Sequence, residues 1–93
     1  MSSSDYKFEV KPRFMEKLEK FSPKTQKRIK DKLKEFKQKV NKYGIDPREH
    51  NNTKYIAKDK VWRLRVRDHR VFFDIYDKTI SILFVEHRKK AYR

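Results

Sequence analysis

The sequence predicts an α+β domain in which two N-terminal helices pack on one face of a small four-stranded sheet, in the order β-α-α-β-β-β. Two observations predict this fold class. Between residues 12 and 43 apolar side chains recur at the spacing of amphipathic helices, whereas residues 6–10 and 62–85 alternate or run continuously as strands do. A chain of 93 residues has room for one hydrophobic core, so we assign residues 1–93 to a single domain and expect residues 1–5 to form a flexible N-terminus.

The first half of the chain predicts one strand followed by two helices. Residues 6–10 alternate apolar and charged side chains until Pro12, which interrupts sheet pairing and suits the first turn of a short helix over residues 12–21. Ser22 and Pro23 then provide the cap and first position of a longer helix that ends near Gly44. The apolar stripe of this longer helix, at spacings of four and three residues, consists of Ile29, Leu33, Phe36, Val40 and Tyr43.

The second half predicts a loop and an antiparallel meander. Residues 44–60 are rich in turn formers and are expected to form a loop that Tyr55 and Ile56 hold to the core. Strands follow at about residues 62–66, 70–75 and 80–85, and the connections between them are too short to hold a helix, so they must be hairpins. Because the helical stripe has no other surface to cover, we expect Leu33, Phe36 and Val40 to contact Leu64, Phe73 and alternate residues of 80–85.

The charge of the chain indicates a polyanionic partner. Lys and Arg number 27 against 13 Asp and Glu, giving a formal net charge of +14. We interpret the many lysines of the longer helix as a solvated face; the alternative is an electrostatic collar for nucleic acid. With no cysteine, disulfides and thiolate chemistry are excluded, and without a membrane-span or secretory-signal pattern we expect a cytoplasmic protein with no membrane partner.

An arginine patch is predicted on the face of the sheet that points away from the helices. If Trp62 and Leu64 point to the helices, the residues between them point the other way, and the next strand opens with a further arginine across a tight turn. The patch consists of Arg63, Arg65, Arg67 and Arg70. Like charges placed together cost stability, so an anionic ligand explains this patch better than a structural role.

Aromatic residues and the C-terminal segment add to this predicted site. We interpret Trp62 as a core residue, whereas Phe72, on the arginine face, is the candidate for stacking on a base. The last strand leads into Glu86-His87-Arg88-Lys89-Lys90-Ala91-Tyr92-Arg93, a basic and aromatic end. The sequence has no carboxylate pair, metal-ligand spacing or glycine-rich phosphate loop, so we expect neither a metal nor a cofactor.

Two segments resemble the RelE/ParE toxin superfamily and, within it, the RelE-like branch of mRNA interferases. Residues 61–71, Val-Trp-Arg-Leu-Arg-Val-Arg-Asp-His-Arg-Val, are similar to a family hairpin with the sequence Tyr-Arg-Leu-Arg-Val-Gly-Asp-Tyr-Arg. Residues 85–92 are similar to a C-terminal Gly-His-Arg-x-x-x-Tyr of the same family. In element order the resemblance extends over the whole chain.

The resemblance implies the toxin of a type II toxin–antitoxin system, a ribosome-dependent endoribonuclease that cuts mRNA and is held inactive by an antitoxin. The implied partners are the ribosome, mRNA and an acidic antitoxin that covers the arginine face or docks on the longer helix. In this branch a tyrosine that matches Tyr92 lies near the 2′-hydroxyl. The basic residues that stabilise the scissile phosphate match Arg63, Arg65, Arg70 and Arg88.

The implied chemistry needs proton carriers as well as cations. Attack of a 2′-oxygen on phosphorus needs no metal where cationic donors stabilise the pentavalent anion, but arginine cannot act as the base. His69, His87 and Tyr92 are therefore the candidate proton carriers, although His87 is equally well explained as a strand-end residue bonded to backbone. The candidate catalytic set is Arg70, Arg88, Tyr92 and His87. The candidate substrate-binding set is Arg63, Arg65, Arg67, His69, Phe72, Lys89 and Lys90.

Two alternatives and one departure from the family pattern accompany this hypothesis. The alternatives are a non-catalytic basic module that binds RNA or DNA by charge, and a gyrase-inhibiting ParE-type toxin of the same fold. The basic set is retained here, which favours the nuclease. Where the family has Gly-Asp-Tyr-Arg, this chain has residues 67–70, Arg-Asp-His-Arg, so we expect Asp68 to shape the turn, because Asp tolerates positive φ.

Overall fold

The computed structural model describes residues 5–91, and Tyr92 and the first four residues lie outside this part of the chain. Within residues 5–91 the chain forms one mixed sheet and three α-helices. The elements are β1 (Lys7–Val10), α1 (Pro12–Leu18), α2 (Pro23–Asn41), a 3-10 helix η1 (Pro47–Glu49), β2 (Thr53–Ile56), β3 (Val61–Val66), β4 (His69–Tyr76), β5 (Thr79–His87) and α3 (Arg88–Ala91). The predicted order of the first strand, two helices and C-terminal meander is confirmed.

The described sheet has five strands in the order β1-β5-β4-β3-β2 rather than the four that the sequence predicted. β1 pairs in parallel with β5, and the other neighbours are antiparallel. The additional strand, β2, lies inside the segment that we expected to be a loop, where Thr53 pairs with Leu64 and Ile56 with Val61. Turn formers flank this short strand on both sides, so the sequence pattern predicts a loop, and the strand is identified by its pairing with β3.

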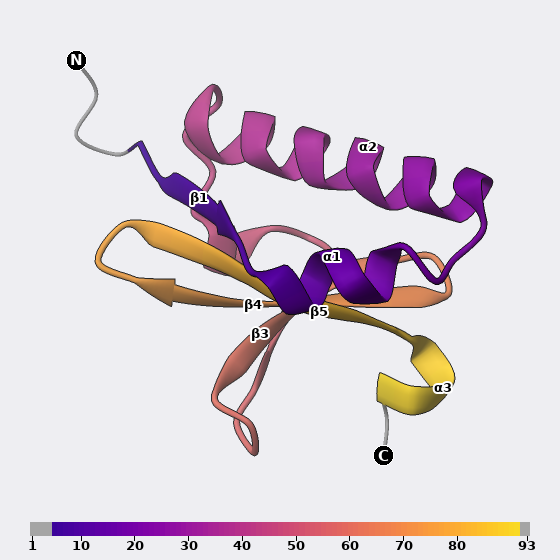
Figure 1. The fold of residues 1–93 in the computed structure, drawn as a ribbon. Helices are drawn as coiled ribbons and strands as arrows, with labels where there is room; N and C mark the ends of the chain where they lie inside the picture. The colour runs from indigo at the N-terminus through magenta and orange to yellow at the C-terminus, as the bar shows by residue number, and fades with distance from the viewer. Residues whose placement is uncertain (1–4, 92–93) are drawn as a thin grey trace.

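α1 and α2 lie on the same face of the sheet, and the β2–β3 hairpin extends away on the other side (Figure 1). The Ser22 side chain accepts a hydrogen bond from the Thr25 N–H, which is the predicted cap of α2. At the other end of α2, the Asn41 side chain both accepts from the Tyr6 N–H (2.7 Å) and donates to the Tyr6 carbonyl (3.0 Å). These bonds attach β1 to the end of α2.

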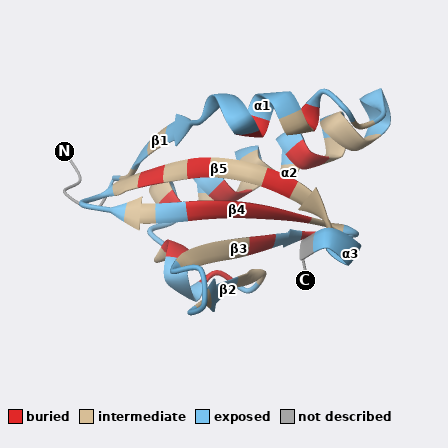
Figure 2. Cartoon of the chain, turned by 60° about the horizontal axis from the view of Figure 1, so that its bottom comes forward, coloured by how far each residue is buried: buried red, intermediate tan, exposed pale blue. Residues whose placement is uncertain are grey.

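The core lies between α2, α1 and the facing side of β3, β4 and β5, where buried positions follow one another along each strand (Figure 2). Phe36 and Val40 from α2 share this core with Leu64 and Phe73, and Leu33 packs half-buried against it. From β5 the core takes Ile80, Ile82 and Val85. The predicted packing of Leu33, Phe36 and Val40 is therefore confirmed, whereas the strict alternation expected along residues 80–85 and the place of Tyr43 in the buried stripe are not, since Tyr43 is 63% exposed and follows the end of α2. The pairing of β5 shifts opposite Phe72 and Phe73, which face Phe84 and Ile82, so Leu83 is an extra, bulged residue, and this bulge accounts for the break in alternation along β5.

The β3–β4 turn differs from the expectation that Asp68 adopts the left-handed conformation. In this turn it is Arg67 that has positive φ, at 55°, and Asp68 does not. A non-glycine residue in this region is held there at a cost of about 1–2 kcal/mol. Arg67, which aligns with the family glycine in sequence, therefore has a conformation that glycine adopts at lower cost.

Candidate functional site

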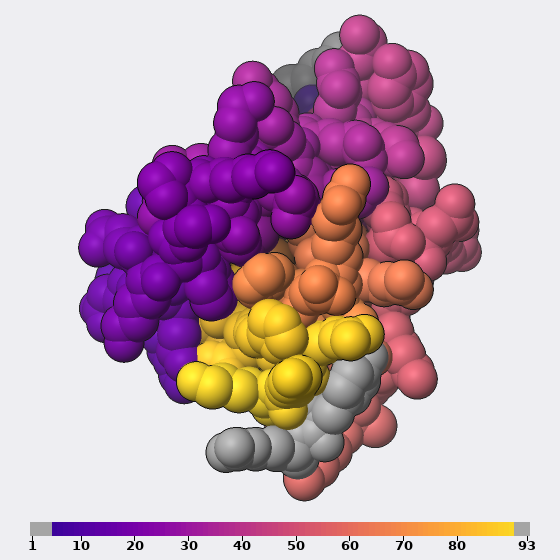
Figure 3. Space-filling model, turned by 90° about the vertical axis from the view of Figure 1, so that its right-hand side faces the viewer, coloured from indigo at the N-terminus to yellow at the C-terminus, as the bar shows by residue number. Residues whose placement is uncertain are grey.

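The predicted site residues gather at one end of the sheet, where the β3–β4 turn, the end of β5 and the start of α3 meet. The Arg88 N–H donates to the Asp68 carbonyl over 2.7 Å, and the Arg88 Nε lies 3.8 Å from the Asp68 Oδ1. These contacts hold α3 against the turn. Figure 3 views the molecule from this end, with the turn in orange between α3 in yellow and the helical half of the chain in purple.

Three of the predicted arginines share one hollow on the face away from the core. Arg63 lies opposite Phe72, and Arg65 opposite Arg70, in the antiparallel register of β3 and β4. Together with residues 51–54, Arg63, Arg65 and Arg70 line a cavity of about 280 Å³, which we call the arginine hollow. The two-residue period of the strand therefore places these side chains as the sequence indicated.

Arg70 is the most buried of these cations, with 6% of its surface exposed. Its Nη1 donates to the Arg67 carbonyl over 2.6 Å and to the His69 carbonyl over 2.9 Å. Such charge-assisted bonds to backbone stabilise the turn and hold the guanidinium in place at the floor of the hollow. The sequence did not predict this burial. Arg65 and Arg88, in contrast, are exposed.

The two imidazoles of the predicted site lie on the other face of the sheet from Arg63 and Arg65. His69 pairs with both Val66 and His87 in the register, and its ring lies 5.3 Å from the His87 ring and 4.7 Å from the Phe21 ring. Burial is the main cause that lowers the pKa of His69, and the neighbouring His87 and Arg28 lower it further while Asp68 raises it. His69 is consequently a neutral imidazole at pH 7.

His87 matches the second of its two sequence interpretations. Its Nδ1 accepts a hydrogen bond from the Lys89 N–H over 3.2 Å at the start of α3. The same side chain lines a small cavity of about 160 Å³ with Lys17, Phe21 and Lys90. Lys89 and Lys90 are both exposed on α3, beside Arg88.

Phe72 is not the stacking surface that the sequence suggested. Only 5% of it is exposed, because the Phe84 ring stacks on it at a centroid distance of 4.7 Å and an interplanar angle of 15°. The Arg13 guanidinium in turn lies 4.6 Å from the Phe84 ring centroid. Trp62, by contrast, packs half-buried against the core, as we expected, with the Tyr55 ring 5.1 Å away.

Several cations around the site come from helices that the sequence reading left aside. From α1, Lys17 forms an ion pair with Glu86 of β5, which ties the helix to the strand beside α3. From α2, Arg28 and Lys32 line a second cavity with Arg65 and Arg67. One signal for Arg28 exists in the sequence: it is the single arginine within the lysine-rich span of α2.

Within residues 5–91, no group of three or more His, Asp or Glu side chains is arranged to hold a metal ion. In the same part of the chain, none of the helices has the length and apolar character needed to cross a membrane.

Residues 8–92 match the family described as the ParE toxin of type II toxin–antitoxin system, parDE. The chain therefore belongs to this toxin family, and with it to the RelE/ParE superfamily. No curated protein matches the chain.

Solved structures of RelE-like toxins share the fold. The RelB–RelE antitoxin–toxin complex from Methanococcus jannaschii is similar at a TM-score of 0.67 and 22% identity, over 90% of this chain and 94% of that one. YafQ from E. coli is similar at a TM-score of 0.65 and 14% identity, over 96% of this chain and 100% of that one. The toxin–antitoxin complex RelBE2 from Mycobacterium tuberculosis is similar at a TM-score of 0.63 and 19% identity, over 90% of this chain and 99% of that one.

Proposed function

We propose that this toxin is a ribosome-dependent endoribonuclease that cleaves mRNA by metal-independent attack of a 2′-hydroxyl on the scissile phosphate. The observation that carries the proposal is the arginine hollow, in which Arg63, Arg65 and Arg70 converge on one face of the sheet. The exposed Arg88 lies against Asp68 of the β3–β4 turn, which connects the two strands that carry these arginines. A pocket floored by a backbone-anchored guanidinium is suited to stabilise an anion that develops during reaction.

The reaction forms a bond from the 2′-oxygen to phosphorus and breaks the bond from phosphorus to the 5′-oxygen, leaving a 2′,3′-cyclic phosphate. A base takes the 2′-hydroxyl proton and an acid returns a proton to the departing 5′-oxygen. We assign proton transfer to Tyr92, on the resemblance to the RelE-like branch. His69 and His87 lie on the face of the sheet opposite Arg65 and Arg70, which disfavours both as proton carriers for a phosphate in the arginine hollow.

The four arginines Arg63, Arg65, Arg70 and Arg88 form two pairs with different roles in this proposal. Arg70 and Arg88 neutralise the pentavalent phosphorane, whereas Arg63 and Arg65 also hold flanking phosphates. Losing one preorganised donor to a developing anion costs about 10²-fold or more in rate.

We propose that an acidic antitoxin is the second partner. A net charge of +14 supports an acidic protein that covers the arginine face or α2, and the similar structures from M. jannaschii and M. tuberculosis contain antitoxins. Action on the ribosome places the protein in the cytoplasm.

Gyrase inhibition is the second candidate, since the matching family is the ParE toxin family. Charge on the arginine face separates the candidates, because phosphate chemistry requires it and protein binding to gyrase does not.

Single-turnover cleavage of a translated messenger, followed by primer extension, tests the proposal. We expect the unmodified protein to cut the messenger. Arg88→Ala and Tyr92→Phe should each lower the cleavage rate by about 10²-fold or more. The control Lys34→Ala, at an exposed position of α2, should leave the rate unchanged. Ribosome affinity should change little in Tyr92→Phe. Intact messenger together with inhibited supercoiling by gyrase would replace the nuclease with the second candidate, and unchanged rates in both variants would refute the assigned residues.

A further inference from the structure

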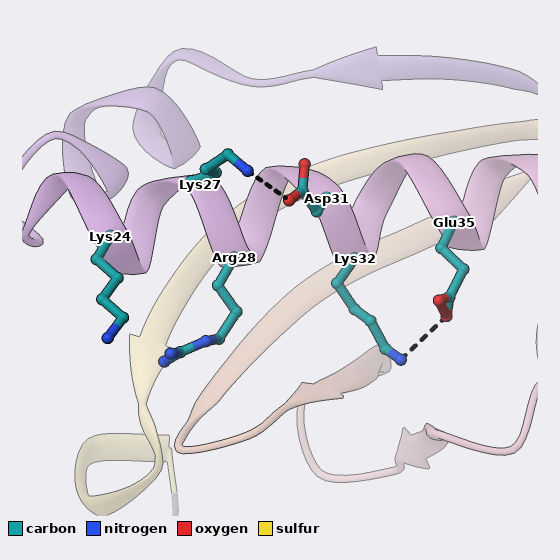
Figure 4. A pocket seen from close by; sticks show the side chains of 6 residues that line it. All are labelled: Lys24, Lys27, Arg28, Asp31, Lys32 and Glu35. Carbon is teal, nitrogen blue, oxygen red and sulfur yellow. Dashed lines mark hydrogen bonds and ion pairs between the residues drawn. The ribbon is translucent and has the colours of Figure 1, made fainter.

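A basic cavity lies between α2 and the β3–β4 turn, next to the arginine hollow. Lys24, Arg28 and Lys32 recur at four-residue intervals and point from one side of α2 toward the hairpin (Figure 4). Arg28 and Lys32 meet Arg65 and Arg67 there and line a cavity of about 380 Å³, which we call the α2 cavity. Asn52 and Val66 complete its lining.

The charges that face the α2 cavity are not neutralised within the described part of the chain. No acidic side chain lines it, and Lys32 alone of its four cations has a carboxylate partner, Glu35 at 3.0 Å. The side chains of Arg28, Arg65 and Arg67 have neither a hydrogen bond nor an ion pair within residues 5–91. Three guanidinium groups held together without a counter-charge repel one another, and an anionic ligand would relieve that repulsion.

The charge of Arg28 also acts on the neighbouring histidine. It contributes to lowering the pKa of His69, which lies at the end of β4 beside the turn. The positive charge of α2 therefore acts at the end of the sheet where the site residues gather, and does not face solvent alone.

The α2 cavity continues into the arginine hollow. Asn52 and Arg65 line both of them, so the two cavities lie on either side of the same stretch of β3. A continuous basic surface therefore passes around the end of the sheet, from the face that carries Arg63 to the side covered by α2. A surface of this shape fits an extended polyanion better than a single small ion.

We propose that the α2 cavity is a second phosphate-binding site, which holds the RNA strand next to the scissile phosphate through Arg28, Arg65 and Arg67. RNA as the ligand rests on the function proposed above. The planar guanidinium groups that line the α2 cavity are suited to bidentate phosphate contacts. An acidic protein segment is the less favoured occupant, because protein interfaces centre on aromatic and apolar anchors and Val66, which is buried, is the single apolar residue lining the cavity.

The test is the salt dependence of binding to a labelled single-stranded RNA of mixed sequence whose 2′-oxygens are methylated, so that no 2′-hydroxyl can attack. We expect Arg28→Gln and Arg67→Gln each to reduce the slope of log K against log salt by about 0.7, the value for one phosphate contact in a single strand. Arg28→Lys keeps the charge without the planar fork and should lose affinity while keeping most of the slope. Lys34→Gln, which removes one charge from an exposed position of α2, is the matched control.

Unchanged slopes in both glutamine variants would overturn the inference, and so would an equal loss in Lys34→Gln, which indicates only the general field of the protein. Weaker binding of the antitoxin with an unchanged RNA slope would also overturn it, because the cavity would then serve acidic side chains. Cleavage of translated messenger is measured on the same proteins. If the unmodified protein cuts nothing while the expected slope changes are seen, the phosphate site is supported and the nuclease function fails.

Discussion

Replacing Arg67 by glycine should stabilise the fold and weaken RNA binding at the same time. Arg67 sits at φ 55°, a conformation that costs an L-residue about 1–2 kcal/mol. Glycine removes this cost but loses roughly 0.5–1 kcal/mol more through the freedom of its unfolded backbone. The difference is a gain of about 0.5–1 kcal/mol in the free energy of unfolding, or about 2–8 °C in Tm for a domain of this size.

The charge of Arg67 has to be separated from its backbone conformation. Arg67 lines the same cavity as Arg65 and Arg28, so removing its charge also relieves the repulsion between these guanidinium groups. Arg67→Ala removes that charge and keeps the strained φ, which makes it the matched control. The bond from Arg70 Nη1 to the carbonyl of residue 67 uses backbone and is retained in both variants.

Urea denaturation at neutral pH, with thermal melting as a second measurement, compares the three proteins. We expect the free energy of unfolding of the glycine variant to exceed that of the alanine variant by about 0.5–1 kcal/mol, and both variants to lose RNA affinity equally. Glycine and alanine variants of equal stability would show that the turn is unstrained, and the argument from φ would fail.

Three further outcomes follow from the packing. Burial and the charges of Lys39 and Lys32 lower the pKa of His50, and Glu35 opposes them with a smaller effect. In the unfolded state His50 has its ordinary pKa of about 6.5, so below that pH the unfolded protein binds more protons than the folded one. Stability should therefore be full above pH 6.5 and fall as the pH drops below it, and His50→Gln should flatten this dependence in urea titrations at several pH values; an unchanged profile would refute the assignment. Lys17→Met should lower the free energy of unfolding by about 1–3 kcal/mol because it leaves Glu86 without its partner, and the double variant Lys17→Met with Glu86→Gln should recover part of it. Phe72→Ala should cost about 3–5 kcal/mol with an unchanged salt slope of RNA binding, whereas a lost slope in a stably folded protein would return Phe72 to the binding surface.

The positions that the sequence predicted well depend on local period. The alternation through Trp62, Leu64 and Val66 determines which side chains of β3 enter the core, and thereby places Arg63 and Arg65 on the opposite face. The stripe of α2 has the same property, since four-and-three spacing allows one buried face.

The features that the sequence did not reveal depend on pairing with distant segments. Phe72 is covered because the bulge in β5 and the ring of Phe84 meet it, and Arg13 joins them from α1. His69 and His87 become neighbours through the register of β4 and β5, which period alone cannot give. The cations of α2 reach the site for a similar reason: the crossing of helix and hairpin selects Arg28 from a helix face that looks uniformly basic in sequence.

The pairing of β1 with β5 sets the order in which the chain can fold as it is synthesised. Lys7 pairs with Thr79 and Val10 with Ile82, so the first strand made waits for one of the last before it has a partner. At about 5–20 residues per second, roughly 4–14 seconds separate their synthesis. Over this interval the sheet is incomplete, because β5 has to lie between β1 and β4. β1 therefore stays unpaired through most of the synthesis of the chain, and the mature fold forms only after β5 has been made.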